Sequence, residues 1–359
     1  MADFLINTYN EFPLTDHIIN MVRESKYYIK TGNFMFREPK MREELLNACR
    51  RGVIVFILSN LGEDADRLMG GNSFGKKEYD PHLPYLNDFA DQGAHVRCMN
   101  ELHAKFLVVD GKQGMVMSSN YTKDSLWGNP ECGVVLDLDN TRYLESIFDT
   151  LFEHADDKIE GRDQDGYKFR KVYSPIVQPE LFDDVLKGDV RLTLSSKIQE
   201  GENASVSNFS CCEISDLYNS IVDAINDSKE YLYLVTYSFR ALDKLRKILV
   251  ALKNAAQRGV SINLFYNLDN KGSNAVVEKL HKAIPNINAQ GIWKNHAKFL
   301  LTENVGLMFT ANIDGEAGLL SGFELGVELT DTQWEEAKDS LFLLIKENNK
   351  KINNGNNEI

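Results

Sequence analysis

The sequence predicts an α/β protein built from two similar domains that are related by a pseudo-two-fold axis. Short apolar runs typical of buried strands alternate with amphipathic stretches typical of helices, and the same succession of segments occurs once in each half. A chain of 359 residues that is 43% hydrophobic is long enough for two domains with large cores. We therefore expect each domain to hold a mixed, largely parallel sheet flanked by helices.

Three pairs of segments establish the internal repeat. The first pair closes a helix and opens a strand, and the second places a helix-ending glycine before a strand. The third pair leads into an amphipathic helix, which Thr332 and Glu335 begin with a capping box in the second half. The pairs are residues 24–28 with 227–231, residues 51–60 with 258–267, and residues 137–141 with 328–332.

The repeat and a polar stretch between its copies set the predicted domain boundaries. We expect short strands near Tyr173 and Leu192 within this stretch, and a C-terminal segment without apolar periodicity. The predicted parts are a first domain at residues 1–157, a connecting segment at 158–210, a second domain at 211–346 and a disordered tail at 347–359.

The first half carries an insertion before its central histidine. Asn60 and His103 are separated by 42 residues, whereas Asn267 and His296 are separated by 28, and we place the extra residues at 61–86. Within the insertion, residues 70–77 are rich in glycine and polar side chains. Either a lid that selects substrates or a surface excursion without a role fits this composition.

A string of polar residues recurs at nearly the same spacing in both halves. A histidine is followed after two residues by a lysine, after seven by an acid, and then by a hydroxyl residue and an asparagine. Two copies make chance a poor explanation. The strings are His103, Lys105, Asp110, Ser118 and Asn120 in the first half, and His296, Lys298, Glu303, Thr310 and Asn312 in the second.

The strands that follow each histidine give this pattern a chemical meaning. Alternation along a strand puts histidine and lysine on one face, and a hairpin would return the hydroxyl and amide beside them. Lysine supplies charge, asparagine and hydroxyl supply directional hydrogen bonds, and imidazole moves protons near neutral pH. Two such sets that face each other would hold a phosphodiester from both sides.

On these residues the chain resembles the phospholipase D superfamily, whose histidine–x–lysine–x4–aspartate string with a downstream Ser/Thr–x–Asn occurs twice per active site. The resemblance extends to Glu131 and Glu324, each 28 residues after the histidine of its half, in the role of carboxylates that hold the other imidazole nitrogen. It departs from the family pattern in Glu303 for aspartate, Thr310 for serine and Met117 where glycine often precedes the serine.

The resemblance implies a two-step phosphodiesterase reaction through a phosphohistidine, with no metal or cofactor required. It assigns His103 as nucleophile and His296 as general acid, and gives charge stabilisation on the phosphate to the two lysines and two asparagines. We interpret Asp110 and Glu303 as structural acids that fix loops. Ser118 and Thr310 stay open between phosphate contact and turn capping. Four of the other histidines, His17, His82, His154 and His281, lack such neighbours and are interpreted as structural.

Composition predicts a cytoplasmic protein without a membrane anchor. The sequence opens without a basic region followed by an apolar stretch, and no run approaches 18 apolar residues. The five cysteines form neither a spaced metal cluster nor an even disulfide set, so we assign them no chemistry; they are Cys49, Cys98, Cys132, Cys211 and Cys212.

The substrate class follows less directly, and we favour nucleic acid, DNA or RNA, over lipid. No basic amphipathic helix or lipidation motif is evident, whereas Lys112, Lys123 and Lys294 would supply a local basic patch in a chain of net charge −13. Trp127 and Trp293 are candidates for base stacking, although core or rim packing is the commoner use of tryptophan. One alternative is a lipid phosphodiesterase or transphosphatidylase, and another is a non-catalytic phosphate-binding scaffold. A protein partner that supplies substrate specificity is compatible with the nuclease and with the scaffold.

Overall fold

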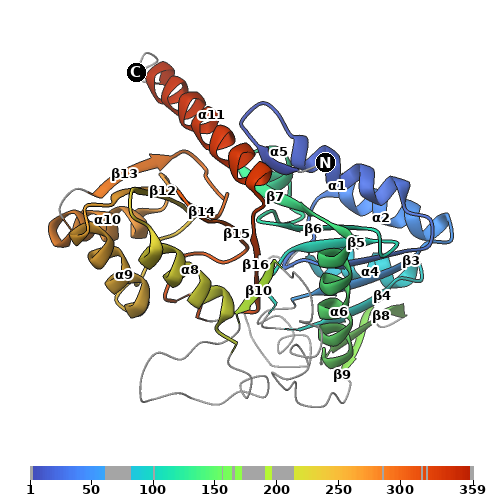
Figure 1. Ribbon diagram of the computed structural model, residues 1–359. Helices are drawn as coiled ribbons and strands as arrows, with labels where there is room; N and C mark the ends of the chain where they lie inside the picture. The colour runs from blue at the N-terminus through green and yellow to red at the C-terminus, as the bar shows by residue number, and fades with distance from the viewer. Residues whose placement is uncertain are drawn as a thin grey trace, which may run out of the picture.

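Two sheets flanked by helices lie side by side in the computed structural model (Figure 1). Helix α11 begins where the two halves meet and runs outward beside β13. The structure describes residues 3–60, 82–99, 102–155, 157–163, 166–171, 191–195, 214–284, 287–316, 318–320 and 322–355.

The first half forms a nine-stranded sheet in the order β1-β7-β6-β5-β2-β3-β4-β8-β9. Its strands are β1 (Phe4–Asn7), β2 (Tyr28–Gly32), β3 (Ile54–Ser59), β4 (His95–Cys98), β5 (Phe106–Val109), β6 (Gln113–Met117), β7 (Glu131–Leu136), β8 (Asp157–Asp163) and β9 (Gly166–Lys171). Its helices are α1 (Pro13–Glu24), α2 (Pro39–Arg50), α4 (His82–Asp91), α5 (Lys123–Trp127) and α6 (Leu138–His154).

The second half forms a seven-stranded sheet in the order β10-β16-β15-β14-β11-β12-β13, which repeats the first seven positions of the first sheet. Its strands are β10 (Leu192–Ser195), β11 (Tyr231–Val235), β12 (Ser261–Asn267), β13 (Ile287–Ile292), β14 (Phe299–Thr302), β15 (Gly306–Phe309) and β16 (Glu324–Glu328). Its helices are α8 (Asp216–Asp227), α9 (Arg246–Gln257), α10 (Lys271–Ala283) and α11 (Asp331–Gly355). The predicted two-domain α/β fold with an internal repeat is therefore confirmed.

The sheets are mixed, as predicted, but they are not largely parallel. Within the described strands, parallel pairing is confined to β2–β3 and β3–β4 in the first half and to β11–β12 and β12–β13 in the second. The remaining described pairs are antiparallel. Strands β5–β6, β8–β9 and β14–β15 are joined by short hairpins, whereas β2–β5 and β11–β14 pair in the middle of the sheets. A hairpin imposes antiparallel pairing, because only a long crossover returns the chain in the same direction.

The repeated helix-to-strand junctions show how local sequence sets the fold. Helix α2 begins at Pro39, and the preceding Glu38 side chain accepts a hydrogen bond from the Met41 amide at 2.6 Å. Gly52 then ends this helix at φ 87°, and Gly259 ends α9 at φ 85°. Both glycines occupy the left-handed region that a helix-ending turn requires, which explains their equivalent places in the repeat.

The segment predicted as a connection contributes strands to both sheets. Strands β8 and β9 extend the first sheet beyond β4, and β10 pairs with β16 in the second sheet. The strand near Leu192 is thus present, while Tyr173 lies outside the described residues. Residues 61–81 of the predicted insertion, including its glycine-rich stretch, also lie outside them, and residues 82–86 belong to α4.

The C-terminal tail expected to be disordered is helical in the structure up to Gly355. Its buried Asn348 accepts a hydrogen bond from the Trp293 amide at 2.9 Å and donates one to the Gly291 carbonyl at 3.2 Å. These long-range contacts stabilise a segment whose own sequence lacks an apolar stripe, so local patterning did not reveal it.

Each half has a hydrophobic cluster of its own, and a further cluster draws residues from both halves and joins the two sheets. Phe4 packs edge-to-face on Phe299 with ring centroids 5.5 Å apart. Across the same boundary, the Ala104 amide donates to the Phe323 carbonyl at 2.8 Å and the His296 amide donates to Pro130 at 2.9 Å. Backbone beside each central histidine is therefore held by the opposite half.

Candidate active site

The predicted site residues of both halves converge at the boundary between the two sheets. His103 and His296 lie shortly before β5 and β14, and the hydroxyl residues lie directly after β6 and β15. Because these strands pair antiparallel, each hairpin returns its hydroxyl residue toward its histidine. Strands β7 and β16, antiparallel to β6 and β15, begin at the same edge with Glu131 and Glu324.

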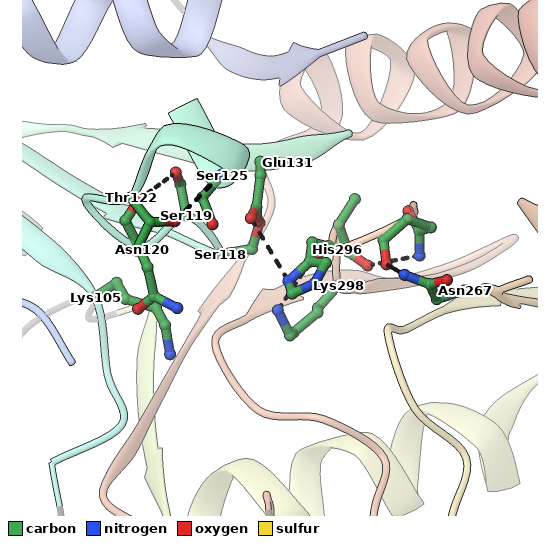
Figure 2. A network of polar contacts seen from close by, with 12 residues as sticks. Lys105, Ser118, Ser119, Asn120, Thr122, Ser125, Glu131, Asn267, His296 and Lys298 are labelled. Atoms are coloured by element: carbon green, nitrogen blue, oxygen red, sulfur yellow. Dashed lines mark hydrogen bonds and ion pairs between the residues drawn. The ribbon is translucent and has the colours of Figure 1, made fainter. Parts of the chain in front are cut away.

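Each central histidine contacts the glutamate of the opposite half. His103 Nδ1 lies 2.6 Å from Glu324 Oε1. His296 Nδ1 lies 3.6 Å from Glu131 Oε1, the contact drawn in Figure 2. Both carboxylates are fully buried, whereas about a quarter of each imidazole side chain is exposed. A buried carboxylate at Nδ1 leaves Nε2 as the nitrogen available to a ligand.

The hydroxyl residues hold these glutamates in place. Thr310 Oγ1 donates to Glu324 Oε2 at 2.5 Å, and Ser118 Oγ donates to Glu131 Oε2. Each hydroxyl oxygen also accepts a hydrogen bond from a backbone amide, at 3.0 Å in both halves. Sequence reasoning weighed phosphate contact and turn capping but missed this contact. The recurring distance along the chain from hydroxyl to glutamate, 13 and 14 residues, is a signal that would have suggested it.

The two lysines are buried beside the histidines. Lys298 Nζ donates to the His296 carbonyl at 2.8 Å, and Lys105 Nζ donates to the His103 carbonyl. Burial and the charge of Lys298, opposed by the attraction of Glu324, lower the pKa of Lys105 to about 7. An anion bound beside Lys105 would therefore stabilise its charged form.

The two asparagines present unpaired polar atoms to the interior. Asn120 Oδ1 and Asn312 Oδ1 are buried and have no hydrogen-bond partner within the described part of the chain. Buried amide groups in native proteins nearly always have partners, so two symmetric exceptions in one site are consistent with a ligand that completes them. The oxygen and nitrogen of each amide are interchangeable by rotation, so either atom can face a ligand.

The environments of the two imidazoles differ. Burial lowers the pKa of His103, but the carboxylate of Glu324 opposes this effect. Burial lowers the pKa of His296 further, to well below its usual range, and Lys298 and Lys105 add to the effect. The glutamates differ in parallel. Burial raises the pKa of both, but contacts with His103 outweigh it at Glu324, whose pKa is lowered, while the pKa of Glu131 is raised.

An aromatic ring packs against each imidazole, which sequence reasoning missed. The Tyr237 and His296 ring centroids are 4.2 Å apart, and those of Phe34 and His103 are 5.3 Å apart. Both aromatic residues lie two positions after equivalent strands, β2 and β11. The signal was present in the repeat, since residues 33–37 (Asn-Phe-Met-Phe-Arg) align with residues 236–240 (Thr-Tyr-Ser-Phe-Arg).

The motif acids lie at the opposite ends of their strands from the histidines. Asp110 accepts hydrogen bonds from three consecutive amides, those of Lys26, Tyr27 and Tyr28, at 2.8–2.9 Å. Glu303 accepts from Lys229 at 2.6 Å and from Tyr231 at 3.4 Å. These contacts fix the loop that enters β2 and the loop that enters β11.

The proposed basic patch is not assembled as a unit. Lys112 lies in the β5–β6 turn, at the far end of that hairpin from His103. Trp127 packs edge-to-face on Phe12 and donates to Glu38 at 3.2 Å, so it serves as a packing residue. Lys294, in contrast, lies two residues before His296, next to Trp293.

Among the residues that the structure describes, no helix combines the length and apolar character needed to cross a membrane. Within the same residues, no group of three or more His, Cys, Asp or Glu side chains is arranged to hold a metal ion.

Comparison with known proteins places this site in a family. The family model described as cardiolipin synthase, PLD-like domain, matches residues 18–152 and 221–342, more than half of the chain. Two curated proteins named cardiolipin synthase 1, from Staphylococcus aureus strains MRSA252 and COL, are 30% identical over 141 residues. That alignment covers 35% of this chain and 26% of each relative, so the match spans about a quarter of the curated proteins.

Solved structures show the same fold at low identity. Phosphatidylserine synthase of Haemophilus influenzae Rd KW20 has a TM-score of 0.61 at 11% identity, over 97% of this chain and 86% of that chain. Polyphosphate kinase of Porphyromonas gingivalis has a TM-score of 0.58 at 12% identity, over 96% of this chain and 50% of that chain. The family-model match confirms the resemblance seen in the sequence: the chain belongs to the phospholipase D superfamily.

Proposed function

We propose that this enzyme hydrolyses phosphodiester bonds of nucleic acid through a covalent phosphohistidine, with His103 as nucleophile and His296 as general acid. The observation that carries the proposal is the pair of imidazoles from opposite halves, each contacting a buried carboxylate from the other half. Two buried lysines and two unpaired buried amides surround them. Such a set of groups is complementary to an anion held between two proton-transfer groups.

In the first step, the Nε2 lone pair of His103 attacks phosphorus. A nitrogen–phosphorus bond forms while the bond from phosphorus to the leaving oxygen breaks, and protonated His296 gives its proton to that oxygen. Glu324 lies 2.6 Å from His103 Nδ1 and keeps the proton of the His103 ring on Nδ1, so that the Nε2 lone pair is free to attack. The same carboxylate stabilises the positive charge that develops on the ring.

In the second step, a water molecule attacks the phosphohistidine. His296, now neutral, takes a proton from this water as an oxygen–phosphorus bond forms and the nitrogen–phosphorus bond to His103 breaks. Both imidazoles then return to their starting protonation states, so the cycle balances without any other reactant.

Lys105 and Lys298, with Asn120 and Asn312, would bind the non-bridging phosphate oxygens through both steps. A general acid must start protonated, but burial and the two lysines lower the pKa of His296. A phosphate between the lysines offsets their charge and favours the protonated imidazole.

A second candidate function is phosphatidyl transfer on lipids. It would use the same first step and replace water by an alcohol in the second. The names of the curated relatives and the family description, all cardiolipin synthase, favour it. We favour nucleic acid because lysines and aromatic rings gather beside His296, as detailed below.

The test is turnover by the purified full-length protein in EDTA on labelled single- and double-stranded DNA, RNA and phospholipid vesicles. His103→Ala and His296→Ala are the test variants, and His281→Ala, on the exposed side of α10, is the matched control. We expect nucleic-acid cleavage that both test variants lose by about 10⁴-fold and the control retains. Lipid turnover alone would establish the second candidate, and phosphate binding without turnover would indicate a scaffold.

A further inference from the structure

A cluster of aromatic and cationic side chains lies immediately before His296. Trp293 and Lys294 form the turn between β13 and the histidine, while Tyr9 follows β1 and Lys351 comes from α11. We call these four residues, together with the buried Asn348, the Trp293 cluster. It draws on three separate parts of the chain.

The backbone of this turn is fixed from two sides. The Tyr9 hydroxyl donates to the Trp293 carbonyl at 2.9 Å, and the Trp293 amide donates to Asn348 Oδ1 at 2.9 Å. Lys294 adopts φ 53°, a left-handed conformation that is uncommon for a residue other than glycine. The turn therefore holds the Lys294 side chain in a position that the chain would not adopt freely.

Two ammonium groups share the indole of Trp293. Lys351 Nζ lies 3.8 Å from the indole centroid and Lys294 Nζ lies 4.8 Å from it, and Lys351 is also 4.5 Å from the Tyr9 ring. Neither lysine forms an ion pair within 4.0 Å in the described part of the chain. Glu347 acts on Lys351 at longer range, after the effects of burial and of Lys294, which both lower the pKa of Lys351.

Simple packing does not account for this arrangement. One lysine packed on the indole would be enough to cover the contact between α11 and β13. A second positive charge beside it destabilises the fold through repulsion between the two ammonium groups. Base stacking, the use considered for Trp293 from sequence, would compete with Lys351 for the ring. Two like charges beside one indole ring, one on the rigid turn and one on α11, suit a ligand that brings negative charge to both.

The cluster lies at the rim of the catalytic site. Lys294 precedes His296 by two residues, so their Cα atoms are within about 7.6 Å. Tyr9 follows β1 by two residues, and Asn7 of β1 pairs with Glu131, which contacts His296. At the same offsets before His103 the sequence has Asn100 and Glu101, a neutral residue and an acid. The sequence therefore has a lysine at this offset before His296 and an acid before His103.

We propose that Lys294 and Lys351 bind a second phosphate of the substrate, beside the scissile phosphodiester and on its leaving-group side. The inference rests on the proposed function, in which His296 protonates the leaving group. It narrows the substrate to a strand with consecutive phosphates, such as a single-stranded polynucleotide, in preference to an isolated diester.

The experiment compares kcat/KM on a single-stranded oligonucleotide with kcat/KM on bis(4-nitrophenyl) phosphate, which carries one phosphate. The variants are Lys294→Gln, Lys351→Gln and their combination. Lys338→Gln is the matched control, because Lys338 also lies on α11 over a tryptophan, Trp334 at 4.6 Å, but beside Tyr231 at the other end of the sheet.

We expect the ratio of the two kcat/KM values to fall at least tenfold in the double variant and to stay constant in Lys338→Gln. The slope of log Kd against log salt for the oligonucleotide should also decrease, by about 0.7 for the lost phosphate contact. An unchanged ratio, or an equal fall on both substrates, overturns the proposal. So does a selective loss on vesicles of a two-phosphate lipid without a loss on the oligonucleotide.

Failure of the proposed function is distinguishable from failure of the second phosphate site. In that case the wild-type protein hydrolyses neither substrate, or the His103→Ala variant retains hydrolysis. Oligonucleotide binding, measured by fluorescence anisotropy, then decides the inference by itself. Weaker binding in the double variant but not in Lys338→Gln supports the second phosphate site, and equal binding in all three proteins refutes it.

Discussion

The two halves of the molecule share one strand order but surround their histidines differently. His103 has a close carboxylate partner at 2.6 Å and a phenylalanine against its ring. His296 has a carboxylate at 3.6 Å, a tyrosine against its ring, and a cationic turn just before it. The duplicated fold supplies two equivalent frameworks, and the contacts made across the boundary distinguish their histidines. Neither half holds a complete site, because each glutamate serves the other half.

The largest expected difference between the halves is the ability to form the covalent intermediate. With bis(4-nitrophenyl) phosphate, whose leaving group needs no proton, His296→Ala should still release nitrophenolate as His103 attacks. The phosphohistidine would then persist because no base activates water. We expect a burst of about one equivalent per protein and, by mass spectrometry, an adduct on His103. His103→Ala should give neither.

The opposite result in this experiment would exchange the roles of the two histidines. A burst in His103→Ala with an adduct on His296 would make His296 the nucleophile, and the lowered pKa of its ring would then describe a nucleophile held neutral. The exposed His281→Ala variant provides the reference for normal turnover without accumulation of an adduct.

The next difference concerns the two orienting carboxylates. Glu324→Gln should lower kcat by about 100-fold, because it removes a close charged partner whose pKa is held low by His103. Glu131→Gln should cost about 10-fold, since burial raises the pKa of Glu131 and glutamine resembles its neutral form. Steady-state kinetics and circular dichroism of both variants measure this contrast. An equal decrease of kcat in the two variants would mean that the difference between the 2.6 Å and 3.6 Å contacts does not distinguish the roles of Glu324 and Glu131.

The pH dependence sharpens the same comparison. Burial and the two lysines lower the pKa of His296, so its acid form is lost at lower pH in the free enzyme than in an ordinary histidine. A bound phosphate offsets the lysine charges and raises that pKa. The alkaline limb of kcat, which reports the complex, should therefore lie at higher pH than that of kcat/KM. Coincident limbs would show that substrate charge does not tune His296.

The sequence revealed the two strings of the candidate site because they recur at fixed spacing within each half, where local chain geometry dictates proximity. It did not reveal which glutamate serves which histidine. The contact of His103 with Glu324 joins residues 221 positions apart, and it depends on how the two sheets pack. Spacing of 28 residues identified both glutamates but carried no information about the partner half.

Other differences have the same origin in long-range contacts. The continuation of α11 depends on Asn348, whose partners Trp293 and Gly291 lie far away in sequence. Several antiparallel pairs, such as β2–β5 and β11–β14, join strands that are distant in the sequence, and apolar patterning alone does not reveal their direction. The sequence repeat aligns the two aromatic residues that pack on the imidazoles, Phe34 and Tyr237. It does not show that they lie at the end of β2 and β11 where the site forms.

The smallest expected difference concerns stability, at the motif acids. Asp110→Ala should lower the free energy of unfolding by about 1–2 kcal/mol, because three amides lose their acceptor. Asp110 also has a left-handed conformation, φ 55°, that alanine tolerates less well. Glu303→Ala should cost about 0.5 kcal/mol, since the contact with the Tyr231 amide is long, at 3.4 Å, and only the contact with the Lys229 amide is short, at 2.6 Å. Denaturant unfolding of both variants measures the contrast.

The pH dependence of these losses tests their cause. Burial raises the pKa of Asp110 and of Glu303, but hydrogen bonds from backbone amides outweigh it and lower the pKa of both. A carboxylate with a lowered pKa in the folded state stabilises the fold above its unfolded pKa, and this contribution is lost as the pH falls through the folded value. The gap in stability between wild type and Asp110→Ala should therefore narrow in acid. A gap that persists unchanged at acid pH would assign the loss to the left-handed backbone at Asp110, and Glu303→Ala, which lacks that feature, would still narrow.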